Sequence, residues 1–431
     1  MLRALVPLVL VLLAAPASAA PLAHREVLPN GIVLLVAERP AVPIVATRLY
    51  LPAGAAFDPP DRGGLAALTG ALLTRGAGKR TGPEIDSAIE FVGGGLEAGA
   101  GRDGLTASLA VLKKDLPLGL DLLADVVLAP TFPEAELKRK VAEIQAAIKQ
   151  SEESPSTLAG RALARLIFPG HPYGRPVEGT RESVARLRRQ DVVSFYGAHA
   201  RPDTAVIAVV GAVTVEEARR AIVARFGGWH RPASSPPAVT PAPGAPPVGS
   251  ETITRELTQA TIVLGRQAVR QGHPDYFPLA VAAYVLGGGS ASRLYTRVRE
   301  EGGLAYSVGA YVNPGRYGAS FAVSAQTRTA EVPRVLDTIR EELARMGREP
   351  VSDRELALAK AYLIGSFPLR LDTSRKVADF IVAVEVLGLG LDYPDRYTAS
   401  IARVSATDVR RVAAAYFASG TLSRVVVGAA P

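Results

Sequence analysis

The second half of this chain repeats landmarks of its first half, and this repetition constrains the fold more than any other feature. The segment Ser183-Val-Ala-Arg-Leu, followed by Asp191, matches Ser400-Ile-Ala-Arg-Val, followed by Asp408. Residues 210–211 match 427–428 at the same offset, and residues 136–137 match 355–356 at almost that offset, in the same order along the chain. Three ordered pairs at almost one spacing indicate an internal duplication of about 200 residues.

A proline-rich stretch separates the two repeats. Residues 231–250 read RPASSPPAVTPAPGAPPVGS, with seven prolines and no periodic apolar pattern. This composition is typical of an extended linker rather than of a helix or a strand. The sequence therefore predicts an N-terminal domain over residues 21–230 and a C-terminal domain over residues 251–431.

Apolar patterns within each half predict both helices and strands. Residues 27–36 and 44–51 are rich in β-branched and apolar residues and are divided by turn signals, and residues 205–210 form a similar run. Helices are expected over 134–150, 180–187 and 191–198, and in the first of these apolar residues recur at spacings of three and four. We expect an α+β fold in which each domain packs a mostly antiparallel sheet against helices, rather than a doubly wound parallel sheet.

The N-terminus resembles a secretory signal. An apolar run over residues 4–15 follows Arg3 and closes on Ala17-Ser18-Ala19, a small-x-small pattern that signal peptidases accept. The run is shorter than the roughly 20 apolar residues that a membrane span requires. We therefore expect a signal peptide over residues 1–19, export to the periplasm, and no membrane span.

Composition excludes several classes of function. Because the chain has no cysteine, it can form neither disulfides nor thiolate metal sites, and it has no thiol nucleophile. The formal net charge is +8, but the basic residues are scattered and only 6% of residues are aromatic. A nucleic-acid surface would require a basic stripe, so we expect no nucleic-acid partner.

Four segments carry a resemblance to a known family. They are LPNG at 28–31, GAAFDPPDRGGLAALTGALLTRG at 54–76, GHPYGRPVEGT at 170–180 and LGGGSASRLYTRVREEGGLAYSVGA at 286–310. Their order and separations, together with the duplication, resemble the pitrilysin/insulinase family of inverted zinc metallopeptidases. The likeness is greatest to the bacterial two-subunit branch related to mitochondrial processing peptidase. The resemblance implies two similar α+β domains that enclose a chamber.

The zinc motif of that family is missing. The resemblance places HxxEH, with two histidine ligands and a glutamate that activates water, on the helix after Gly64-Leu-Ala. The matching positions here are Ala67, Gly70 and Ala71, and the position of the third ligand is Ala147. No two histidines of the chain share a helical turn, since they stand at positions 24, 171, 199, 230 and 273. We expect no cofactor in this chain, and we expect His171 to shape a loop.

The arginine and tyrosine that the family uses at the substrate are retained. Arg299 and Tyr306 match a pair that, in the family, holds the substrate backbone and the oxyanion. Both side chains suit a developing negative charge, because they donate hydrogen bonds and arginine is cationic. The turn at 302–303 predicts that a helix ends and a strand begins between them, so that the side chains converge. Alternatively, Arg299 belongs to a solvated face with its charged neighbours, and Tyr306 only opens a strand.

Three functions follow from these observations. The leading one is a non-catalytic, substrate-binding subunit of a periplasmic zinc metallopeptidase. In that role Arg299 and Tyr306 complete the active site of an HxxEH-bearing partner that holds the zinc and cleaves peptides, and this chain is inactive alone. The resemblance also implies that peptide substrates bind as an extended strand at a sheet edge. The second function is an inert peptide-binding or scaffold protein of the cell envelope, comparable to the core subunits of respiratory complexes. The third, a self-sufficient hydrolase, predicts bound zinc in the isolated chain.

Overall fold

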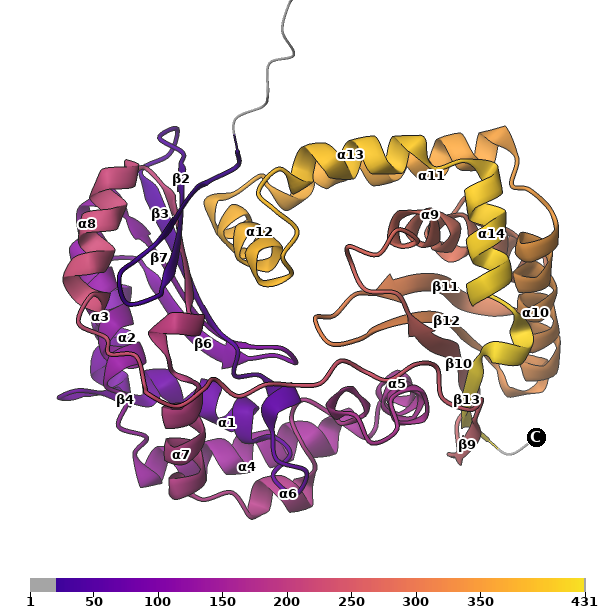
Figure 1. Ribbon diagram of the computed structural model, residues 1–431. Helices are drawn as coiled ribbons and strands as arrows, with labels where there is room; N and C mark the ends of the chain where they lie inside the picture. The colour runs from indigo at the N-terminus through magenta and orange to yellow at the C-terminus, as the bar shows by residue number, and fades with distance from the viewer. Residues whose placement is uncertain (1–20, 430–431) are drawn as a thin grey trace, which may run out of the picture.

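The chain forms two halves of similar construction, each a sheet with helices packed on it. The computed structural model describes residues 21–429, so the expected signal peptide at 1–19 lies outside the described residues. In Figure 1 the N-terminal half, indigo to magenta, lies on the left and the C-terminal half, orange to yellow, on the right. Within the described residues, no helix has the length and apolar character needed to cross a membrane.

The sheet of the N-terminal half is antiparallel except for one pair of strands. Its strands lie in the order β1-β2-β8-β3-β7-β6, and β2 and β8 are the parallel pair. Their bounds are β1 His24–Val27, β2 Val33–Glu38, β8 Val206–Gly211, β3 Ile44–Leu51, β7 Leu105–Leu112 and β6 Gly95–Ala100. A short hairpin of β4 (Gly76–Ala77) and β5 (Arg80–Thr81) stands apart from this sheet.

The sheet of the C-terminal half repeats this order. Its strands lie in the order β11-β12-β10-β13-β9, and again the only parallel pair among its described strands is the last, β13 with β9. Their bounds are β11 Ala305–Asn313, β12 Ala319–Arg328, β10 Gln259–Ala268, β13 Ser423–Gly428 and β9 Ser250–Thr254. The series β6-β7-β3-β8-β2 thus corresponds strand for strand to β11-β12-β10-β13-β9. This match confirms the predicted duplication and the predicted α+β class with mostly antiparallel sheets.

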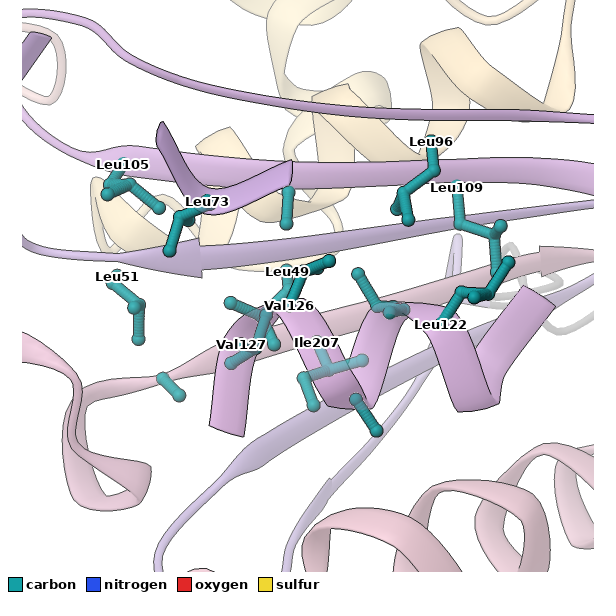
Figure 2. Close-up of a cluster of buried hydrophobic side chains, with 14 of the residues drawn as sticks. Leu49, Leu51, Leu73, Leu96, Leu105, Leu109, Leu122, Val126, Val127 and Ile207 are labelled. Carbon is teal, nitrogen blue, oxygen red and sulfur yellow. The ribbon is translucent and has the colours of Figure 1, made fainter. Parts of the chain in front are cut away.

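Helices of each half cover one face of its own sheet and bury the apolar side chains of that face. The helices of the first half are α1 Leu65–Leu72, α2 Gly82–Phe91, α3 Leu116–Leu128, α4 Glu134–Ser151, α5 Pro155–Ile167, α6 Arg181–Ala185, α7 Arg189–His199 and α8 Val215–Phe226. Those of the second half are α9 Tyr276–Gly287, α10 Val332–Arg348, α11 Asp353–Gly365, α12 Ser374–Val386, α13 Tyr393–Arg403 and α14 Ala406–Tyr416. Figure 2 shows the first core, where Leu122 and Val126 of α3 face Leu49, Leu109 and Ile207 of the sheet.

The repeated aspartates of the sequence perform the same local task in both halves. Asp191 accepts a hydrogen bond from the backbone N–H of Arg188 at 2.8 Å and caps the start of α7. Asp408 accepts one from the N–H of Ser405 at 2.9 Å at the start of α14. A carboxylate at this position satisfies backbone donors that the first turn of a helix leaves free. The duplication is therefore visible in the helix caps as well as in the strand order.

One helix of each half packs against the sheet of the other half. Helix α12 of the second half packs Val377, Ile381 and Val382 against strands β2, β3 and β8 of the first. Helix α5 of the first half packs Ala162, Leu163 and neighbouring residues against β10 and β13 of the second. In Figure 1, α12 and α5 lie between the two sheets, at opposite ends of the space that separates them. Because each half completes the apolar core of the other, the two halves form one interlocked unit.

A polar clasp joins the equivalent hairpin turns of the two halves. Asp103, in the turn between β6 and β7, accepts hydrogen bonds from the Tyr173 hydroxyl and, at 3.0 Å, from the backbone N–H of Arg316 between β11 and β12. The Tyr173 hydroxyl oxygen in turn accepts from the N–H of Tyr317 at 3.1 Å. The clasp fixes the C-terminal hairpin, whose first strand carries Tyr306, against the first half.

His171 ties the segment after the first half to the body of the protein. Its Nδ1 accepts the N–H of Tyr173 at 3.1 Å and caps a short turn over Pro172–Gly174. Because Nδ1 accepts, Nε2 carries the proton and donates to the carbonyl of Thr240 at 3.0 Å. Residues 228–249 contain neither helix nor strand, and this bond ties Thr240 of that segment to the loop of His171.

Candidate functional site

Arg299 lies on a π-helical turn that is firmly anchored to the second half. The turn spans Tyr295–Glu301, and Leu294 and Val298 are completely buried beneath it. Next to it, Arg293 makes a two-fold ion pair with Glu355 at the start of α11, at 2.6 and 3.0 Å. Burial acts to raise the pKa of Glu355, but hydrogen bonds from Arg293 and Ser352 lower this pKa to about 2. π-helical turns are rare and are frequent at functional sites.

A glycine turn and a β-bulge direct Tyr306 toward this helix. Gly303 has φ +57°, in the left-handed region that glycine adopts without strain. Strand β11 then begins, and Ala305 pairs with Thr327 while Ser307 pairs with Gln326. Tyr306 is therefore the extra residue of a bulge, and its side chain is 74% exposed. A bulge turns a side chain away from the regular alternation of a strand.

The Arg299 guanidinium lies over two tyrosine rings. Its central carbon is 5.5 Å from the centroid of the Tyr306 ring and 5.0 Å from that of Tyr295. The structure thus brings together the two residues that the sequence singled out and adds a third that sequence reasoning missed. The sequence does contain a signal for Tyr295: it stands four residues before Arg299, a spacing that places two side chains side by side on a helix.

Arg299 stands apart from the ion-paired face of its own helix. Arg297 has carboxylate oxygens of Glu301, Glu341 and Glu342 within 3.6–3.9 Å. For Arg299, no carboxylate lies within 4.0 Å anywhere in residues 21–429. Arg299 is exposed, as are Arg297, Glu300 and Glu301, but of the two arginines only Arg297 pairs with glutamates in the described chain. Rings that contact a guanidinium through its flat face leave the N–H groups at its edge free to bind an oxygen.

The last strand of each sheet borders one of two places: the Arg299/Tyr306 site in the second half, and helix α1 in the first half. Within the described part of the chain, β11 and β6 each have a neighbour on one side only. Strand β11 carries Tyr306, and β6 lies against α1, the helix on which the family's zinc motif would fall. The free backbone groups of such strands can pair with an extended peptide.

The positions of the missing zinc motif offer no ligands. Ala67 and Ala71 are partly exposed on one face of α1, and Ala147 is exposed on α4. Gly70 is buried, and a Cβ added to it would lie 2.5 Å from the backbone nitrogen of Ala100 and 2.6 Å from the carbonyl carbon of Gly99. The backbone of β6 thus occupies the space that a glutamate side chain at position 70 would need.

The close approach at Gly70 is itself part of the duplication. Gly287, its counterpart on α9 at the offset of the two repeats, meets β11 in the same way, because its added Cβ would lie 2.3 Å from the nitrogen of Ala310. Both glycines allow a helix to cross the last strand of its sheet at backbone contact. Gly70 therefore has a packing role that a larger residue cannot fill without moving the strand.

A buried carboxylate sets the start of α1. Asp58 accepts hydrogen bonds from the N–H groups of Gly64 and Ala66, both at 2.8 Å. Burial raises the pKa of Asp58 to about 6, against the opposing effect of these two bonds. Because both oxygens of Asp58 are used for capping, it is a structural residue and not a metal ligand.

The remaining histidines do not assemble a metal site either. His199 is buried, its Nδ1 lies 3.0 Å from the carbonyl of Pro52, and burial lowers its pKa. Within residues 21–429, no group of three or more His, Cys, Asp and Glu side chains is placed to hold a metal ion. The residues at the family's zinc positions are alanine and glycine, so they do not fit the ion.

Comparisons with known proteins identify a peptidase family. The sequence profile described as Insulinase (Peptidase family M16) matches residues 33–181, and the one described as Peptidase M16 inactive domain matches residues 186–363. An uncharacterized zinc protease of Streptomyces coelicolor is 30% identical over 397 residues, which cover 90% of this chain and 86% of the relative. An uncharacterized zinc protease of Bacillus subtilis is 27% identical over 80% of this chain and 83% of its own length.

Solved structures show the same fold. A peptidase M16 inactive domain from Pseudomonas fluorescens superposes with a TM-score of 0.87 at 24% identity, over 95% of this chain and 98% of the other. A protease from Helicobacter pylori gives a TM-score of 0.87 at 17% identity, over 95% and 99%. A chain of Complex III2 from Candida albicans gives 0.80 at 18% identity, over 94% and 95%.

Proposed function

Because this chain belongs to the insulinase (M16) family of peptidases, we propose that it is a non-catalytic, substrate-binding subunit of a zinc metallopeptidase. One contrast carries the proposal. Arg299 and Tyr306 converge, and no side-chain hydrogen bond within residues 21–429 uses their donor groups, whereas α1 offers alanine and glycine where the zinc motif would be. A chain in this condition can hold a substrate but has no group to activate water.

In the proposed complex, a partner subunit bearing HxxEH supplies the zinc. Arg299 and Tyr306 act on the substrate that the partner cleaves. The guanidinium N–H groups and the tyrosine O–H donate hydrogen bonds to the carbonyl oxygen of the scissile peptide, which gains negative charge during attack. The substrate peptide binds as an extended strand, which requires main-chain pairing and little sequence specificity. The signal-like N-terminus supports a periplasmic location for this complex.

The decisive experiment compares the purified chain, its HxxEH-bearing partner and their mixture in a peptide-cleavage assay. We expect cleavage by the mixture and none by this chain alone. Arg299→Ala with Tyr306→Phe should lower kcat/KM of the mixture by about 100-fold or more, as loss of transition-state donors does elsewhere. The matched control is Arg334→Ala with Tyr362→Phe, an exposed arginine and tyrosine of the same half. Unchanged activity in the first double variant, or zinc-dependent cleavage by this chain alone, would sink the proposal.

A scaffold role is the second candidate. It is favoured by the likeness of fold to a chain of Complex III2 from Candida albicans, at a TM-score of 0.80. In this case the chain would co-purify with envelope proteins or peptides but with no HxxEH-bearing homologue. Affinity purification from a periplasmic fraction separates the two candidates, because only the first requires a zinc-bearing partner.

A further inference from the structure

Arg299 is the only arginine of the segment 293–299 that no carboxylate holds within the described chain. Arg293 pairs with Glu355, and Arg297 has three glutamates within 3.6–3.9 Å. An exposed arginine carries a flexible side chain, and about 2 kcal/mol of rotamer entropy opposes its fixation in one orientation. Something other than an ion pair must therefore orient the Arg299 guanidinium.

Tyr306 is a weak candidate for this task. Its ring is 74% exposed and sits in a bulge at the very start of β11. It is also proposed to bind substrate itself, so it cannot serve as a fixed support.

Tyr295 is better placed. It is half-buried, it belongs to the same π-helical turn, and its ring centroid is the closer of the two, at 5.0 Å against 5.5 Å. The next residue toward the N-terminus, Leu294, is fully buried, and Arg293 is locked to Glu355. The Tyr295 backbone is thus fixed by packing on one side and by a two-fold ion pair beside it.

We propose that Tyr295 is a positioning residue that holds Arg299 for the substrate. A ring that supports the guanidinium through its face leaves the N–H edge free, whereas a carboxylate would occupy that edge and neutralise the charge. The inference rests on the proposed function, since the oriented group acts only if Arg299 meets a substrate. The orientation of the Arg299 guanidinium depends on the aromatic ring of Tyr295 and not on its hydroxyl.

Two variants separate the ring from the hydroxyl. Tyr295→Phe keeps the ring, and Tyr295→Leu removes it while retaining an apolar side chain. In the mixture with the HxxEH-bearing partner, Tyr295→Leu should lower kcat/KM about 3- to 30-fold, the range expected for one cation–π contact. Tyr295→Phe should remain within about twofold of the unmodified chain. Tyr362→Leu, at an exposed tyrosine of the same half, serves as the control.

A double-mutant cycle distinguishes positioning from general damage. In the Arg299→Ala background, Tyr295→Leu should have no further effect, because the group that it positions is gone. An equal loss in both backgrounds, or an equal loss with Tyr295→Phe, would overturn the inference.

A measurement on the isolated chain makes failure of this inference distinguishable from failure of the proposed function. The side-chain Nε–H resonance of Arg299, assigned with Arg299→Lys, should show an upfield ring-current shift that Tyr295→Phe keeps and Tyr295→Leu reduces to the part that the Tyr306 ring contributes. A shift that Tyr295→Leu leaves unchanged refutes the positioning role. If the shift is present but Arg299→Ala leaves cleavage by the mixture unchanged, the proposed function is refuted instead, and with it any role of Tyr295 in it.

Discussion

The guanidinium carbon of Arg299 lies 5.5 Å from the centroid of the Tyr306 ring, although a π-helical turn, a glycine turn and the start of a strand separate the two residues. Two local irregularities produce this approach. Gly303 reverses the chain in a left-handed conformation, and the bulge at Tyr306 rotates one side chain out of the alternation of β11. The contact therefore depends on backbone geometry as much as on the two side chains.

Arg299→Lys tests whether the planar guanidinium group is needed. Lysine keeps the positive charge but offers neither the flat face that stacks on tyrosine nor two parallel donors. We expect the variant to lower kcat/KM of the mixture by about tenfold or more, with the main effect on kcat. Steady-state kinetics on one peptide check this. Full activity of the variant would show that charge alone suffices.

Gly70→Ala tests the crossing of α1 over β6. The added Cβ would lie 2.5 Å from the backbone of Ala100, and overpacking of this kind costs about 1–3 kcal/mol. Gly197 on α7 is the control, because its added Cβ meets nothing within 4 Å and it is exposed. Gly197→Ala should raise the free energy of unfolding by about 0.5–1 kcal/mol. Urea unfolding of both variants measures the difference.

The same crossing predicts how an attempt to restore the zinc motif would fail. The variant Ala67→His, Gly70→Glu, Ala71→His should be less stable than the unmodified chain and should not bind zinc stoichiometrically, because Ala147 supplies no third ligand. Zinc titration by calorimetry checks this. Tight binding of one zinc ion by a stable variant would contradict the packing role assigned to Gly70.

Asp58 predicts how stability depends on pH. Its pKa is raised by burial to about 6 in the folded state, while the ordinary value is about 3.9. The folded protein therefore retains a proton that the unfolded chain loses between about pH 4 and pH 6. The free energy of unfolding should fall through this window as pH rises, by about 3 kcal/mol from this group.

The control for this prediction is Asp61, which is exposed on the same loop. Asp58→Asn should remove most of the pH dependence between pH 4 and pH 6, and Asp61→Asn should retain it. Glu355 affects stability at lower pH. Because its pKa is depressed to about 2, its contribution to the free energy of unfolding is lost as pH falls toward that value. An unchanged slope in Asp58→Asn would show that its carboxyl does not titrate in this range.

Elements with a strong apolar period could be predicted from the sequence. The strand expected at 44–51 is β3, Ile44–Leu51, and the helix expected at 134–150 is α4, Glu134–Ser151. The duplication also followed from the sequence, because aspartates such as Asp191 and Asp408 cap equivalent helices. Side-chain pattern determines such features locally, without reference to distant parts of the chain.

Features that depend on distant backbone could not be predicted. The pattern of α12 indicates that one of its faces is buried, but not that Ile381 packs on the other half's sheet. Gly70 stands where the family has glutamate, and its recurrence as Gly287 at the duplication spacing indicates a shared packing role only once the approach of the strand is known. The π-helical turn and the bulge depend on hydrogen bonds that composition does not reveal. The chamber between the halves stays a prediction.

The exchange of α5 and α12 predicts that the halves unfold together. Ile381 belongs to the second half, yet it is fully buried against the sheet of the first half. Ile381→Ala should lower the free energy of unfolding by about 2–5 kcal/mol, because it leaves a cavity between the halves. Amide hydrogen exchange should show reduced protection in β3 and β8, strands of the first half that lie far from the substitution in the sequence. Ile339→Ala on α10, within the core of the second half, calibrates the cost of the same truncation. Two separate unfolding transitions, with β3 and β8 unaffected by Ile381→Ala, would mean that each half is stable without the helix that the other half packs against its sheet.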